Sequence, residues 1–168
     1  MNADMARRRR EEAAAEYRPE QVRLLLIAEA PPSGLDRYFY FEDVRDQDSL
    51  FRYVVRTVLQ VEPTRGAKPV LLAGLRDAGV FLVDLKTDPT LGDEPLDRYV
   101  EDLVERARAL GPEHVITIKA NVGTLCQRPL RAAGLDVVDE RVPFPGSGQQ
   151  GRFQEAMGRA LTSIGWNC

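Results

Sequence analysis

Four short, largely apolar segments alternate with longer amphipathic ones, and this alternation constrains the fold more than any other feature of the chain. The apolar segments are residues 22–28, 80–85, 114–118 and 135–139. Each is bounded by glycine, proline or charged residues, which is typical of a short strand buried on both faces of a sheet. The sequence therefore predicts four strands.

The segments between the predicted strands carry apolar residues at intervals of three and four, the period of an amphipathic helix. These predicted helices cover residues 50–59, 69–78, 96–110, 122–133 and 153–164. Strands that alternate with helices form parallel sheets, joined by right-handed crossovers that cover both faces. We expect an α/β fold: a three-layer sandwich with a central four-stranded parallel sheet flanked by helices.

Length and composition bound the domain and its partners. A chain of 168 residues, 43% hydrophobic and 29% charged, suits one globular domain. We assign residues 20–168 to that domain and residues 1–19 to a flexible or helical tail, whose basic run at residues 7–10 is expected to be solvated. The net charge of −3 argues against a general affinity for nucleic acid, which depends on Lys and Arg.

Cysteine and histidine content exclude several kinds of site. The chain has two cysteines, Cys126 and Cys168, and one histidine, His114. These are too few for a disulfide framework or for a zinc or iron–sulfur site built by the protein, so we expect no metal and no cofactor. No segment has the roughly 20 apolar residues of a membrane span, and no export signal is visible. The expectation is a cytoplasmic monomer that makes no membrane contact.

Two acids lie where predicted strands end, which is where ligands bind in open parallel sheets. Glu29 leaves the first predicted strand just before two prolines, so a stiff backbone would hold its carboxylate where it can orient water. Asp84 closes an apolar strand, where an acid needs a partner or a ligand, and it is a candidate for recognising the edge of a base. The alternatives are a solvated loop acid for Glu29 and an ion pair with Lys86 for Asp84.

Four consecutive aromatic residues follow the first of these loops: Tyr38, Phe39, Tyr40 and Phe41. Alternation along an extended chain would bury the two phenylalanines and leave the two tyrosines on the other face. Tyr38 and Tyr40 are therefore candidates for stacking against a flat base. A core or edge strand is the alternative interpretation.

The segment 143–150 combines prolines and glycines with amide side chains, directly before the last predicted helix. Pro and Gly at this density fix the shape of the backbone. Ser147, Gln149, Gln150 and Arg152 would then lie around a helix N-terminus, which suits an anion such as phosphate. An ordinary connector is the alternative.

These loops, in this order, resemble those of the uracil-DNA glycosylase superfamily over residues 22–164. Residues 28–34, Ala-Glu-Ala-Pro-Pro-Ser-Gly, look like the first motif of the branch written Gly-Glu-Ala-Pro-Gly, in which the acid assists the attacking water. Residues 80–89 look like the strand and loop that carry the base-reading Asn. The loop 144–150, which begins Phe-Pro-Gly-Ser, looks like the second motif, His-Pro-Ser-Pro or its variants, which enters the minor groove and stabilises the leaving base. The iron–sulfur cysteines of that branch are absent.

The resemblance implies a role for each matching residue and exposes two departures. Glu29 would position water, and Asp84 and Phe144 would contact the base. Asp84 stands where the family has Asn, and a carboxylate that accepts from an exocyclic amine or a ring N–H suits a base other than uracil. Phe144 stands where the family has His, which removes a donor to the departing base.

We therefore expect a glycosylase-like domain that binds a damaged or deaminated base of single- or double-stranded DNA and, as an enzyme, excises it. The alternative is a non-catalytic module of the same fold that binds nucleic acid, a nucleotide or a protein partner. Phe144 and the acidic balance of the chain favour this alternative.

Overall fold

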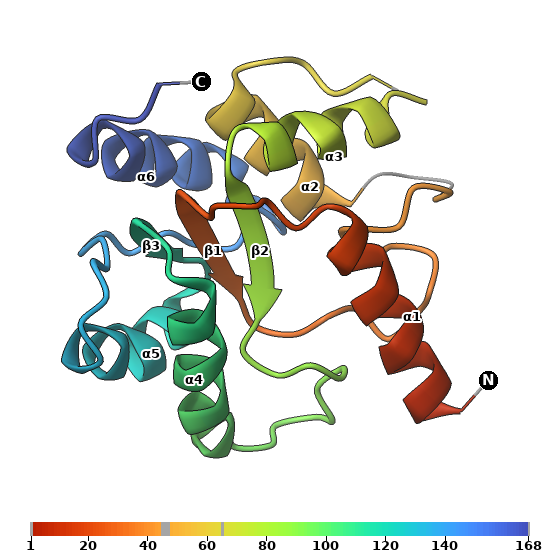
Figure 1. The fold of residues 1–168 in the computed structure, drawn as a ribbon, viewed down its shortest axis with the longest axis horizontal. Helices are drawn as coiled ribbons and strands as arrows, with labels where there is room; N and C mark the ends of the chain where they lie inside the picture. The colour runs from red at the N-terminus through yellow and green to blue at the C-terminus, as the bar shows by residue number, and fades with distance from the viewer. Residues whose placement is uncertain (1, 45–47, 65, 168) are drawn as a thin grey trace.

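A parallel sheet of three strands forms the centre of the protein (Figure 1). The computed structural model describes residues 2–44, 48–64 and 66–167. The strands are β1 (Leu24–Ala28), β2 (Val80–Asp84) and β3 (His114–Thr117), in the order β2–β1–β3. All five residues of the central strand β1 are buried, as expected of a strand covered on both faces.

Helices cover both faces of this sheet, which confirms the predicted α/β layering (Figure 1). On one face are α2 (Ser49–Val54), the π-helical turn η1 (Val55–Leu59), α3 (Lys68–Asp77) and α6 (Gln150–Ser163). On the other are α4 (Val100–Leu110), which follows the short helix η2 (Asp97–Tyr99), and α5 (Ala120–Ala132).

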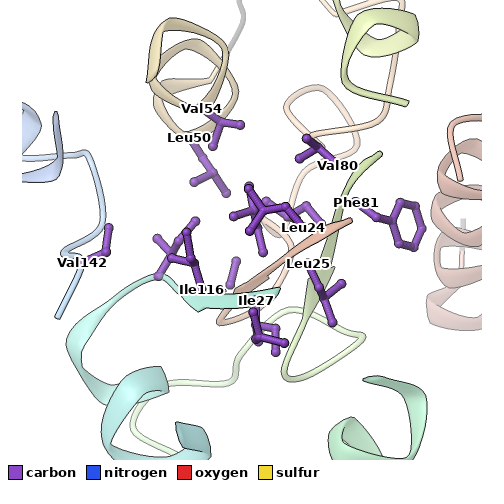
Figure 2. Packing of buried hydrophobic residues seen from close by; sticks show 14 of the residues in the cluster. Leu24, Leu25, Ile27, Leu50, Val54, Val80, Phe81, Ile116 and Val142 are labelled. Carbon is purple, nitrogen blue, oxygen red and sulfur yellow. The ribbon is translucent and has the colours of Figure 1, made fainter. Parts of the chain in front are cut away.

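Side chains of β1 alternate between the two helical layers. In Figure 2, Leu24 lies on the side of Leu50 and Val54 of α2, whereas Leu25 and Ile27 point to the opposite face. All five of these side chains belong to one continuous core of buried apolar residues. The apolar runs in the sequence thus supply both layers of the core from one strand.

The predicted fourth strand at residues 135–139 is wrong. That segment meets β3 only at an isolated parallel bridge between Val115 and Val137, and a second isolated bridge joins Ile118 to Val142. Two of its five residues are aspartates, which leaves too little apolar surface for a strand covered on both faces. The buried side chain of Gln127 contacts the segment instead: its Nε2 lies 3.5 Å from the carbonyl of Val138 and 3.3 Å from that of Glu140, the next residue after the segment.

The N-terminal segment forms helix α1 (Ala3–Glu16), which lies beside β2 in Figure 1. Its basic run is not fully solvated as expected, because the loop after β2 offers acceptors. Arg10 is 5% exposed, and its Nη2 donates to the carbonyl of Thr87 at 3.0 Å and to Asp88 at 3.1 Å. Arg7 also pairs with Asp88. A guanidinium can be buried when its donors meet such acceptors.

Tyr40 makes a hydrogen bond whose loss we expect to measure. Its buried hydroxyl accepts from the backbone N–H of Leu82 in β2 at 2.8 Å. Tyr40→Phe leaves that N–H without a partner and should lower the free energy of unfolding by about 1–3 kcal/mol in a denaturant titration. Tyr38→Phe is the matched control, because the Tyr38 hydroxyl bonds to no described residue. Equal losses in the two variants would contradict this assignment.

Candidate functional site

A cavity of about 400 Å³ opens at the carboxyl end of β1. We call it the Glu29 cavity. Glu29, Pro32 and Arg37 form one wall, the start of α2 with Asp48 and Ser49 another, and Lys119 and Phe144 complete it. Its volume is within the range of roughly 300–1,000 Å³ that is common for small-molecule sites. The structure thus brings together Glu29 and Phe144, two of the residues that the sequence predicted.

Both oxygens of the Glu29 carboxylate are held by donors from the segment that follows β3. Lys119 Nζ lies 2.7 Å from Oε2, and Asn121 Nδ2 lies 2.6 Å from Oε1. The Glu29 side chain is still 22% exposed, so water reaches it. A carboxylate fixed in this way can orient a water molecule and accept its proton.

Lys119 and Asn121 are candidate site residues that the sequence analysis missed. They lie 90 and 92 residues beyond Glu29, but β3 is the neighbour of β1 and both strands end at the same edge. The rule that ligands bind at the carboxyl ends of strands applies to this short segment as well as to the longer loops. Its position directly after the predicted strand 114–118 was the available signal.

Arg37 and Asp48 were also missed. Arg37 is an exposed cation on the cavity wall. Asp48 caps α2 by accepting from the N–H of Phe51 at 2.7 Å, and burial raises its pKa. Near Asp48, burial lowers the pKa of Lys68 to about 8. The Glu29 cavity is therefore lined by Arg37 and Asp48, and Lys68 lies close to Asp48.

Asp84 ends β2 opposite Ala28 of β1, and it does not line the Glu29 cavity. Its carboxyl makes no hydrogen bond with the part of the chain that the structure describes. The alternative of an ion pair with Lys86 is wrong, because Lys86 pairs with Glu94. Burial raises the pKa of Asp84 to about 7; the cations Arg106 and Arg10 oppose this rise.

Tyr38 and Tyr40 do not form the predicted stacking platform. Their exposed fractions are 8% and 2%, and their ring centroids lie 6.1 Å apart within an aromatic cluster. Residues 38–41 form a turn closed by a bond from Phe41 N to the carbonyl of Tyr38, so the alternation expected of a strand does not apply. Phe144, which is 42% exposed on the cavity wall, is the aromatic ring available to a ligand.

The loop 143–150 has the fixed shape that its composition predicts. Gly146 N donates to the carbonyl of Phe144 at 2.9 Å, and Gln149 N donates to that of Gly146 at 3.0 Å. Ser147 and Gly148 both adopt positive φ, 50° and 83°. Two successive turns therefore present Phe144 to the Glu29 cavity and lead directly into α6.

A second cavity, of about 340 Å³, lies on the other side of this loop. Gln149 and Arg152 line it together with Arg141 and Arg159, whereas Ser147 and Gln150 line neither cavity. Arg159 pairs with Glu140. Arg141 donates to Thr124 Oγ1 at 2.8 Å and meets no carboxylate, and Arg152 has no ion-pair partner among the described residues. Two guanidinium groups without an ion-pair partner in the described chain thus face this cavity, which one acid, Glu155, also lines.

Metal sites and membrane spans were sought within residues 2–44, 48–64 and 66–167. Over these ranges, no three His, Cys, Asp or Glu side chains gather as they would around a metal ion. Over the same ranges, no helix has the length and apolar character to cross a membrane. Cys126 is buried, which raises the pKa of its thiol to about 12, and Cys168 lies outside the described residues.

The geometry of the cavity can be set beside known proteins. No family model matches the chain. A search of curated proteins finds no relative either.

Proposed function

We propose that this protein is a glycosylase-like domain that takes one base of a DNA strand into the Glu29 cavity and hydrolyses its N-glycosidic bond. The observation that carries the proposal is the Glu29 carboxylate, held through both oxygens by Lys119 and Asn121 on the wall of a cavity at the strand ends. In this role Glu29 orients a water molecule toward C1′ of the sugar and takes its proton.

The neighbouring residues support a base as the ligand. Phe144 offers an exposed ring to the face of a base, and such stacking is worth about 1–3 kcal/mol per base. Asp84 ends the adjacent strand and has no hydrogen-bond partner in the described chain, but it does not line the Glu29 cavity, so its role in recognising the base edge stays a prediction. A base must leave its stack to reach such a site, and a damaged or unpaired base does so at the lowest cost.

The test is base release from oligonucleotides that carry uracil, hypoxanthine, xanthine or a mismatch, in single- and double-stranded form. Release of one of these bases by the wild-type protein, with an abasic strand as the other product, is the expected result. No release from any substrate would overturn the enzymatic proposal.

Phe144 favours a second candidate, a non-catalytic module that binds a base in the same cavity. A phenyl ring stacks on a base but donates no hydrogen bond to a departing one. In that case the oligonucleotides would bind at low salt without any release, and binding would weaken when Phe144 is replaced by Ala.

The second cavity predicts how binding depends on salt. We assign the guanidinium groups of Arg141 and Arg152 to phosphates of the bound strand, across the loop from the base. Replacing either by Gln should lower the slope of log affinity against log salt concentration by about one and weaken binding for every sequence alike. Arg108→Gln removes the same charge from an exposed position on α4 and should leave the slope unchanged. An unchanged slope in the two cavity variants would contradict the assignment.

A further inference from the structure

Lys119 has a strained backbone at the edge of the Glu29 cavity. Its φ and ψ are 85° and 136°, in a region that residues other than glycine rarely adopt, and such strain costs about 1–3 kcal/mol. Two backbone hydrogen bonds to neighbouring segments hold Lys119 in this conformation. Lys119 N donates to the carbonyl of Val142 at 2.8 Å, and the N–H of the preceding Ile118 donates to that of Ile27 at 2.8 Å.

This conformation delivers an ammonium group to the cavity. Nζ lies 2.7 Å from Glu29 Oε2, and the Lys119 side chain is 43% exposed. An ammonium has three donors, and Glu29 is the one acceptor that Lys119 Nζ meets within the described chain. Two donors are therefore free for a ligand in the same cavity, which Phe144 also lines.

In the proposed reaction, Lys119 loses its negatively charged partner at the step in which the base departs. In that reaction the water oxygen bonds to C1′, the C1′–N bond breaks, and its electron pair stays on the base, which leaves as an anion. The proton of the water passes to Glu29. The carboxylate thereby loses the charge that neutralised Lys119, at the step where negative charge develops on the base, and a cation placed there stabilises that charge.

Asn121 is able to accommodate the neutral form of Glu29. Its Nδ2 donates to the carboxylate at 2.6 Å, and its Oδ1 is buried without a hydrogen-bond partner. A rotation of the amide would turn this oxygen toward Glu29 as an acceptor for the new O–H. Both protonation states of Glu29 can thus be satisfied without moving Lys119.

We infer that Lys119 stabilises the negative charge of the departing base, the role that Phe144 cannot fill. The inference rests on the proposed function, because it needs a base in the Glu29 cavity. It assigns to the site a preference for an anionic ring over a neutral ring of the same shape.

The test measures binding of free uracil and of barbituric acid, a ring of the same size that is an anion at neutral pH. The background is Glu29→Gln, whose amide resembles the neutral acid and leaves Lys119 without its counter-ion. This variant should bind barbiturate about 10- to 100-fold more tightly than uracil, as expected of a hydrogen bond to a charged group. Adding Lys119→Gln should abolish the preference, and Lys119→Arg should restore part of it. Arg37→Gln, which removes another cation that lines the same cavity, should keep most of it.

One control separates loss of the ammonium group from loss of the fold. Lys119→Gly should unfold at the same temperature as the wild type or higher, because glycine adopts this φ without strain, so a lost preference in that variant would not reflect unfolding. Equal binding of the two rings, or a preference that survives Lys119→Gln, would overturn the inference and leave the base-binding function intact. Failure to bind either ring, by the wild type and the variants, would overturn the proposed function itself.

Discussion

Glu29→Gln is expected to lower the rate of base release by about 10²- to 10⁴-fold while DNA binding is nearly unchanged. The amide keeps the size of the side chain and can still face Lys119 and Asn121, but it does not accept a proton from water. Single-turnover release of the base measures the chemical step, and a binding isotherm on the same oligonucleotide measures affinity.

Glu113→Gln is the matched control for this variant. Glu113 is an exposed acid just before β3, at the opposite end of the strands from the cavity. Its replacement should leave release unchanged. If Glu29→Gln released base as fast as the wild type, Glu29 would not be the group that activates water.

Asp84→Asn is expected to stabilise the protein at pH 8 and to leave its stability almost unchanged at pH 4. Burial raises the pKa of Asp84 to about 7 in the folded state, whereas an unfolded chain has a value near 4. Between these values the folded protein keeps a proton that the unfolded chain has released, so the stability of the wild type falls as pH rises through this window. Above the folded pKa the loss is complete.

The amide does not titrate, so the variant escapes this loss. A tenfold difference between the acid dissociation constants of the folded and unfolded states corresponds to roughly 1.4 kcal/mol. The Asp84 side chain is mostly buried but keeps some contact with solvent, which weakens the effect, so the expected gain at pH 8 is roughly 2–4 kcal/mol. Denaturant titrations of both proteins from pH 4 to pH 8 measure it. Parallel stability curves would show that Asp84 does not hold its proton in the folded state.

The same proton bears on the predicted role of Asp84 in base recognition. An ionised carboxyl only accepts hydrogen bonds, whereas the neutral acid presents a donor and an acceptor, as an amide does. With a pKa of about 7, both forms of Asp84 are populated near neutrality. The sequence suggested a carboxylate suited to bases other than uracil; the buried environment adds a neutral form that matches a uracil edge.

The sequence predicted the elements that depend on local pattern. The aliphatic run of β1 and the apolar stripe of α4 each indicate which residues are buried, and the structure contains both elements. The strand predicted at residues 135–139 was wrong because a short apolar stretch next to a glycine has the same local pattern as a buried strand. Whether this segment pairs with β3 along its length depends on contacts with β3, and the local sequence pattern carries no information about those contacts.

The sequence predicted only those residues of the candidate site that lie in segments of distinctive composition. Glu29 and Phe144 lie in loops of distinctive composition, and they line one cavity. Lys119 was not predicted because its position after a predicted strand was the only signal, and its φ of 85° is imposed by bonds to distant segments. Tyr38 and Tyr40 were misplaced because a turn, which brings both rings into the core, follows different rules from a strand.

The bond from Leu82 to the Tyr40 hydroxyl has a consequence for assembly. β2 is the outer strand of the sheet on this side, and an outer strand with free N–H groups is a template onto which another chain can add. Tyr40 already occupies the Leu82 N–H, so an incoming strand would have to displace a buried tyrosine to extend the sheet. This hydroxyl thus blocks one of the N–H groups that an added strand would need at the β2 edge.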